Sequence, residues 1–73
     1  MNSPLVTVII PAYNHERFIA QSIRSVINQD YENIELVILN DGSRDKTHDV
    51  ICTLVDECRQ RFPRFEYINK ANE

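Results

Sequence analysis

The sequence predicts an α/β domain that is one half of a doubly wound parallel sheet, with element order β-α-β-α-β, strand order 3-2-1 and both helices on one face. Three observations predict this class. Residues 36–39 are apolar on both alternating sets of side chains, which suits a strand of a covered parallel sheet. Residues 16–28 and 46–61 repeat apolar side chains at the helical period. Prolines and the single glycine stand near the ends of these segments.

The first strand is expected at residues 5–10, LVTVII, which are nearly all apolar or β-branched. Pro11 is expected to end it. The first helix is expected over residues 16–28, with Asn14 or a neighbour as its N-cap. Phe18 lies beside the apolar face of this helix, which is formed by Ile19, Ile23, Val26 and Ile27.

The second strand, around residues 36–39, stops at an acidic turn and leaves Asp41 just past its carboxyl end. Ser43 or Asp45 is expected to cap the second helix, residues 46–61. A third, shorter strand is expected at residues 65–68, followed by a polar loop to residue 73. The core face of the second helix is expected to consist of Val50, Ile51, Leu54, Val55, Cys58 and Phe62.

Length and composition indicate one small globular domain. The chain has 73 residues, 42% of them hydrophobic and 26% charged, with no apolar segment long enough for a membrane segment and no signal peptide. It passes from Met1 directly into a strand-like run, so we expect a native N-terminus and a cytoplasmic protein. The net charge of −3 and the scattered basic residues argue against nucleic acid as a partner.

The cysteines and histidines are interpreted as structural or solvated groups. Cys52 and Cys58 lie six residues apart in one predicted helix, which turns them about 120° away from each other and excludes a shared disulfide or metal. Cys58 is expected in the core and Cys52 beside it. His15 and His48 lack partners at a ligand spacing and are interpreted as solvated.

One face of the predicted sheet lacks cover. The first two strands are apolar on both faces, yet both helices fall on the same side. We therefore expect that the chain is the N-terminal piece of a larger protein. We also expect a homo-oligomer, formed through the uncovered face or the free edge of the first strand.

The candidate site lies where the first two strands end. Tyr13 and Asp41 follow adjacent parallel strands, so both should reach one crevice, where the ring offers a stacking surface and the carboxylate accepts hydrogen bonds. The single glycine, Gly42, follows the second strand, so neither G-x-G-x-x-G nor a P-loop is present. Recognition of a nucleoside is therefore expected rather than a pyrophosphate cradle.

The run VTVIIPAYNHERFIAQSIRSVINQDYENIELVILNDGSRDKT resembles the start of the family 2 inverting glycosyltransferases. Four motifs occur at that family's spacing: a strand followed by Pro-x-Tyr-Asn, then Ser-Val-x-x-Gln, Tyr-x-Asn-x-Glu and Asp-Gly-Ser-x-Asp. Two residues depart from the pattern: Asn40 stands where the family most often has Asp, and Asp30 where it often has Thr.

The resemblance implies a Rossmann-like GT-A fold and a sugar-nucleotide donor, expected to be a UDP-sugar. It implies that Pro11, Ala12 and Tyr13 line the nucleotide pocket and that Asp41 binds the base, with Glu16 or His15 as a weaker assignment. A divalent cation, Mg or Mn, is expected for the full-length enzyme. Its Asp-x-Asp ligands and the catalytic base do not occur in this chain and are expected downstream of Glu73, so no catalytic residue is assigned here.

Two other classes stay open. One is a non-catalytic nucleotide-binding or self-assembling α/β module that uses the uncovered sheet face. The other is a different nucleotide-binding α/β enzyme. Nucleotide binding that depends on Asp41 would favour the transferase, whereas self-association without nucleotide binding would favour the module.

Overall fold

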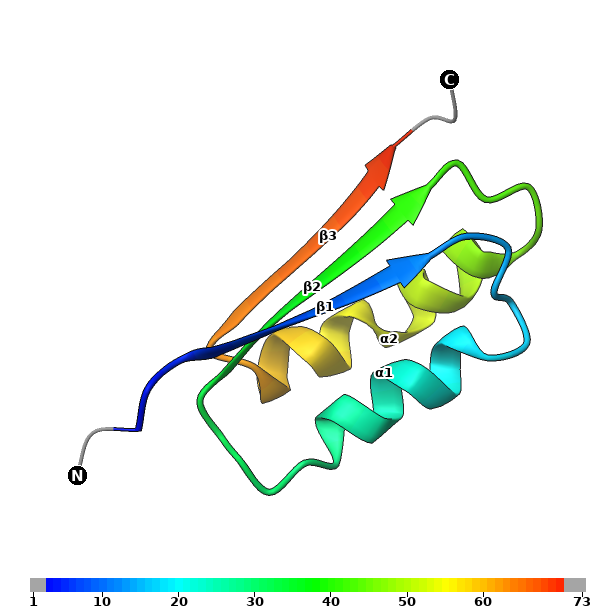
Figure 1. Cartoon of the computed structure of the whole chain (residues 1–73). Coiled ribbons are helices and arrows are strands. Elements are labelled where there is room, and N and C mark those ends of the chain that lie inside the picture. The colour runs from blue at the N-terminus through cyan, green and yellow to red at the C-terminus, as the bar shows by residue number, and fades with distance from the viewer. Residues whose placement is uncertain (1–2, 71–73) are drawn as a thin grey trace.

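The computed structural model describes residues 3–70, which form a three-stranded parallel sheet and two helices. The elements are β1 (Val6–Ala12), α1 (Ile19–Ile27), β2 (Ile34–Asp41), α2 (Thr47–Arg61) and β3 (Arg64–Lys70). β2 lies between β1 and β3, which is the predicted strand order read from the other edge. Both helices lie on the same face of the sheet (Figure 1). The predicted α/β half-sheet is confirmed.

The core lies between the helices and one face of the sheet. Along β2, buried residues alternate with half-buried ones, as expected for a strand covered on one side. The predicted core faces of both helices are confirmed: their central residues are buried and the flanking valines are partly buried. Phe18 remains 62% exposed. The buried apolar residues are Ala12, Ile19, Ile23, Ile34, Leu36, Ile38, Ile51, Leu54, Cys58 and Phe62.

The opposite face of the sheet has no cover from any part of residues 3–70. Ile9 at the centre of β1 is 61% exposed. Val37 and Leu39, its neighbours on β2 by register and alternation, are half-buried. The apolar character of both faces of β2 is therefore matched by helices on one side only, as the sequence predicted.

The prediction that Pro11 ends the first strand is wrong. β1 continues through Pro11 to Ala12, which pair with Leu39 and Asn40 of β2. β1 is an edge strand, where proline is tolerated because a strand edge does not require every N–H.

The first helix begins later than predicted, at Ile19 rather than residue 16. Asn14 is not its N-cap. Phe18 occupies that position and makes no side-chain capping hydrogen bond. Asn14 instead adopts a left-handed φ of 53°, which asparagine tolerates better than most residues. It belongs to a turn that directs the chain toward the neighbouring loop.

The remaining boundaries differ by small amounts. Asp41 is the last residue of β2 rather than the first beyond it, and Gly42, with φ of 68°, provides the turn that follows. β3 is longer than predicted and includes Asn69 and Lys70; the rest of the predicted polar loop lies outside the described residues. The helices have 9 and 15 residues, and no helix within residues 3–70 has the length and apolar character to cross a membrane.

Candidate functional site

A groove opens at the carboxyl edge of the sheet, between the ends of β1 and β2. β1 and β2 are paired as far as Ala12 and Asn40, so the next residues, Tyr13 and Asp41, leave adjacent strands at the same level. Paired strands lie about 4.8 Å apart, which brings both residues to one space. The groove has a volume of about 430 Å3 and is lined by Pro11, Ala12, Tyr13, His15, Leu39 and Asp41.

The groove combines an aromatic ring with a carboxylate. Tyr13 is 47% exposed, so part of its ring is open to a ligand. Asp41 is exposed at the end of β2, and the half-buried Leu39 adds apolar surface. A ring that can stack and a carboxylate that can accept hydrogen bonds are suited to a flat, donor-bearing ligand such as a nucleobase with its ribose.

The structure brings together four of the five residues assigned from the sequence: Pro11, Ala12, Tyr13 and Asp41. Glu16 does not line the groove, and its role in binding stays a prediction. His15, the weaker alternative, does line the groove and is exposed as predicted.

A set of hydrogen bonds ties the β1–α1 loop to the β2–α2 loop, two segments that lie at the same edge of the sheet (Figure 1). We call this set the loop strap. Three successive main-chain N–H groups of the β1–α1 loop donate to side chains of the β2–α2 loop or of Thr47, the first residue of α2. One main-chain N–H of the β2–α2 loop donates to a side chain of the β1–α1 loop. The bonds are Asn14 N–H to Ser43 Oγ (2.9 Å), His15 N–H to Thr47 Oγ1 (2.7 Å), Glu16 N–H to Asp45 Oδ2 (3.2 Å) and Arg44 N–H to Asn14 Oδ1 (2.8 Å).

Asp45 acts on both sides of the strap. Its Oδ1 accepts the N–H of Thr47 at 2.9 Å and also the Thr47 hydroxyl, while its Oδ2 accepts the Glu16 N–H. Loss of water around the carboxyl opposes ionisation, but these hydrogen bonds outweigh it and hold the pKa of Asp45 below its usual 3.8. Asp45 is therefore ionised at neutral pH, when it holds both loops. The prediction that Ser43 or Asp45 is the N-cap of the second helix is wrong: that position is occupied by Lys46, which makes no side-chain capping hydrogen bond, and Asp45 instead accepts the N–H of Thr47, the first residue of α2, from one position earlier.

Thr47 and Asn14 are the members of the strap that sequence reasoning did not assign. The sequence predicts Asn14 only as a candidate N-cap, and it assigns no role to Thr47. The sequence offers one signal, because Ser43, Asp45 and Thr47, which follow Gly42 closely, are residue types whose side chains commonly hydrogen-bond to main-chain groups. The sequence does not indicate the partner of those side chains, since the partner lies about 30 residues away.

A second polar network, formed by Asn40, Ser43, His48 and Tyr67, lies next to the loop strap at the same edge of the sheet. Asn40 is 1% exposed; its Nδ2 donates to the Tyr67 hydroxyl at 3.0 Å, and its Oδ1 accepts the Ser43 hydroxyl. Nδ1 of His48 lies 2.8 Å from the Tyr67 hydroxyl, and the two rings stack with centroids 5.7 Å apart. Burial raises the pKa of Tyr67, against the lowering effect of the Asn40 hydrogen bond. The interpretation of His48 as solvated is wrong, because it is half-buried in this network.

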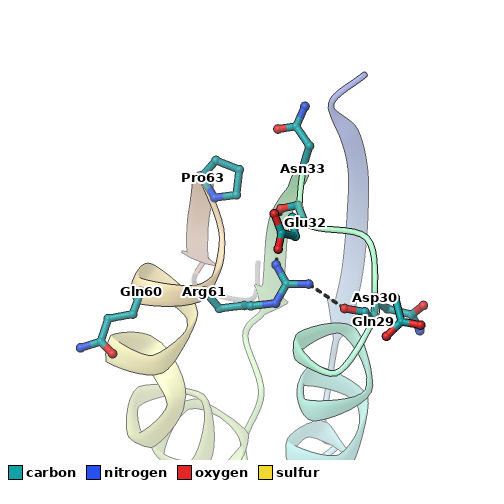
Figure 2. Close-up of a pocket in the computed structure, with 7 residues that line it drawn as sticks. All are labelled: Gln29, Asp30, Glu32, Asn33, Gln60, Arg61 and Pro63. Carbon is teal, nitrogen blue, oxygen red and sulfur yellow. Dashed lines mark hydrogen bonds between the residues drawn. The ribbon is translucent and has the colours of Figure 1, made fainter. Parts of the chain in front are cut away.

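A larger pocket, of about 700 Å3, lies at the opposite end of the sheet (Figure 2). Its centre is Arg61, whose guanidinium donates to the carbonyl oxygens of Ile27 (2.8 Å), Gln29 (2.9 Å), Tyr31 (2.8 Å) and Glu32 (3.4 Å). Four of the five guanidinium N–H groups are thus engaged. Arg61 therefore stabilises the α1–β2 connection and does not offer an anion site.

The described residues do not form a site for the divalent cation that the resemblance implies. Within residues 3–70 no group of three or more His, Cys, Asp or Glu side chains is arranged to hold a metal ion. The nearest carboxylate along the chain from Asp41 is Asp45, and both of its oxygens are engaged by the strap. No chemical step through a metal is derived from this part of the chain.

A parallel half-sheet with a groove at the carboxyl ends of its strands is an α/β domain of the class in which ligands commonly bind at that edge. The particular family follows from comparison with known sequences. The family described as glycosyl transferase family 2 matches residues 7–73, and the chain belongs to that family. The resemblance found in the sequence is thereby confirmed.

Individual relatives agree with this assignment. The chain is 46% identical over 57 residues, 78% of its length, to an uncharacterised glycosyltransferase of Haemophilus influenzae, and 59% identical over 46 residues, 63% of its length, to a second such protein of that organism. It is 41% identical over 64 residues, 88% of its length, to the glycosyltransferase GlyA of Streptococcus pneumoniae. The chain spans only 23%, 14% and 9% of these three proteins, respectively.

Proposed function

We propose that this chain is the nucleotide-recognition segment of a glycosyltransferase that transfers a sugar from a nucleotide sugar, a UDP-sugar, to an acceptor hydroxyl. The observation that carries the proposal is the groove in which Tyr13 and Asp41 face one space at the carboxyl edge of a family 2 half-sheet. Asp41 would accept hydrogen bonds from the base. The ring of Tyr13 would stack on the base or ribose, with Pro11 and Ala12 as the floor.

The hydrogen bonds at this edge favour a nucleoside over a phosphate as the ligand. Backbone N–H groups near helix N-termini bind phosphates when they are free. Here the N–H groups of Asn14, His15 and Glu16, which precede α1, donate to side chains of the neighbouring loop. At α2, the N–H groups of Ser43, Arg44 and Thr47 donate to Asn40, Asn14 and Asp45. The diphosphate and its metal would therefore be held by other residues of a complete enzyme, which would also provide the catalytic base.

Two further expectations stay predictions. The cytoplasmic location has a sequence argument only, and the homo-oligomeric state rests on the uncovered face of the sheet. A non-catalytic, self-assembling module remains the second candidate function, and the observation that favours it is the exposed face around Ile9.

Calorimetric titration of the 73-residue chain with UDP tests the proposal. We expect weak binding, with a Kd on the order of 0.1–1 mM, since the chain provides only the nucleoside half of the contacts. Asp41→Ala should abolish measurable binding, because the base loses its charged acceptor, a contact worth about 1.5–3 kcal/mol.

Asp30→Ala is the matched control, since Asp30 is an exposed carboxylate that lines the pocket at the opposite end of the sheet. It should bind UDP as the wild type does. Equal affinity of wild type and Asp41→Ala would refute the assigned groove. Absence of UDP binding together with tight self-association would favour the assembly module.

A further inference from the structure

The loop strap fixes the segment that follows Tyr13. Tyr13 is directly followed by Asn14, His15 and Glu16, and the main-chain N–H group of each of these donates to a side chain of the β2–α2 loop or of the first turn of α2. The side chain of Asn14 accepts a further hydrogen bond from the Arg44 N–H. The position of Tyr13 relative to Asp41 thus depends on residues that do not themselves line the groove.

Thr47 is the most buried member of the strap, with 0% of its surface exposed. Its hydroxyl accepts the His15 N–H at 2.7 Å and donates its proton to Oδ1 of Asp45. Both roles require a hydroxyl group, which serine also provides and valine does not. A helix of this length does not need a buried hydroxyl at its first position, so helix formation alone does not explain the choice of threonine.

The two carboxylate oxygens of Asp45 accept hydrogen bonds from two different segments. Oδ1 accepts the N–H of Thr47, the first residue of α2, and Oδ2 accepts the N–H of Glu16 in the β1–α1 loop. An asparagine at this position would keep one oxygen for Thr47 and turn an N–H2 group toward the Glu16 N–H. Two donors would then face each other, so the hydrogen bonds to Thr47 at the start of α2 would remain while the link to the β1–α1 loop would be lost.

We propose that Thr47 and Asp45 are positioning residues for the nucleoside groove: they hold the β1–α1 loop so that Tyr13 faces the same space as Asp41 before any ligand arrives. This inference rests on the proposed function for the identity of the ligand. It assigns roles to two side chains outside the groove lining, and it explains their action through main-chain hydrogen bonds rather than ligand contact. Pre-organisation of this kind strengthens binding because the loop need not be ordered by the ligand.

Two measurements on the 73-residue chain test the inference: amide hydrogen exchange by NMR and calorimetric titration with UDP. In Thr47→Val, exchange of the His15 and Glu16 amides should accelerate by about 10-fold or more, while the core amides of β2 stay within about twofold. The Kd for UDP should rise by about fivefold or more, since part of the binding free energy now orders the loop. Thr47→Ser should restore both values, and Asp45→Asn should accelerate exchange at Glu16 while leaving the helix content unchanged.

Thr53→Val is the matched control. Thr53 lies on the same helix, is exposed, and its hydroxyl bonds only to the Val50 carbonyl, so the same substitution should change neither measurement. Unchanged exchange at His15 and Glu16 in Thr47→Val would overturn the inference, as would accelerated exchange with undiminished UDP affinity. If the wild type does not bind UDP, the proposed function fails, and faster exchange confined to the β1–α1 loop still supports the strap as the device that fixes the groove.

Discussion

Asn40 acts as both a hydrogen-bond donor and an acceptor near the carboxyl end of β2. Its amide donates to the Tyr67 hydroxyl and accepts from the Ser43 hydroxyl, and Ser43 in turn accepts the Asn14 N–H. An aspartate at this position, which the family pattern favours, could only accept hydrogen bonds when ionised. Asn40 therefore links β3 to the loop strap without a buried charge, and the departure from the pattern has a structural explanation.

Cys58 is the residue whose ionisation should affect stability at high pH. Burial, with a smaller contribution from the charge of Glu57, raises the pKa of its thiol from 9.0 to about 11. A raised pKa in the folded state favours the neutral form, so this stabilisation is complete below pH 9.0 and is lost as the pH rises to about 11. Each unit corresponds to about 1.4 kcal/mol, and relaxation of the folded chain around a buried thiolate reduces the effect, so we expect a loss on the order of 1–2 kcal/mol. Urea denaturation between these pH values measures it.

Cys58→Ala provides the comparison for this prediction. The variant should be less stable at neutral pH, because it leaves a small cavity, yet its stability should fall less steeply between pH 9 and 11 than that of the wild type. Cys52 is exposed, so Cys52→Ala should retain the wild-type slope. Parallel curves for wild type and Cys58→Ala would contradict the assignment.

At the scale of elements, Arg61 joins the end of α2 to the α1–β2 connection. Its guanidinium donates to the carbonyl groups of Gln29 and Glu32 (Figure 2) and to those of Tyr31 and of Ile27, the last residue of α1. Arg61→Lys should destabilise the fold by about 1–3 kcal/mol, because an ammonium group cannot reproduce the planar fork and leaves carbonyl groups without a donor. The urea midpoint at neutral pH is the measurement.

Arg59 offers a control for the same substitution on the same turn. It is exposed, and Arg59→Lys should shift the free energy of unfolding by no more than about 0.5 kcal/mol. Equal midpoints for Arg61→Lys and Arg59→Lys would show that the carbonyl contacts do not contribute net stability.

Most elements could be predicted because their signals are local. Apolar periodicity correctly assigned both helices and all three strands, and the second helix began within one residue of its prediction. The errors occurred where distant partners decide the outcome. Pro11 stays in β1 because that strand lies at the sheet edge, and α1 starts at Ile19 because the preceding N–H groups bond to another loop rather than to a cap. Neither fact is encoded in the residues adjacent to the boundary.

The site was predictable to the same extent. The sequence places Tyr13 and Asp41 after adjacent strands, and the register of β1 and β2 brings them to one groove. The sequence did not indicate that Thr47 would be buried or that His48 would contact Tyr67, because these contacts arise from how α2 packs on β3 and on the β1–α1 loop. The hydrogen bonds of these buried and half-buried polar residues are thus the part of the site that apolar periodicity does not predict.

At the scale of the whole molecule, the half-sheet is covered on one side. The open face, on the side away from the helices, carries Ile9 of β1, Val37 and Leu39 of β2, and Ile68 of β3, and it also carries the exposed Glu66 of the edge strand β3, which pairs with Val37. Opposite charges flank this apolar centre at both ends of the sheet, since Glu35 pairs with Arg64 and Asp41 with Lys70. A second copy, turned end to end, would place its apolar residues on those of the first, with Glu66 at the β3 edge of the contact and both signs of charge at either end.

The 73-residue chain in isolation is therefore expected to self-associate through this face. Multi-angle light scattering should give at least twice the mass of one chain. Ile9→Glu should shift the protein to one chain per particle, because a carboxylate in place of an apolar contact residue would have to be buried without a partner. Gln21→Glu makes the same change of charge at an exposed site on α1, away from the sheet, and should leave the mass unchanged. A stable monomer for the wild type would refute the prediction, and an associated Ile9→Glu variant would assign the contact to the free edge of β1 instead.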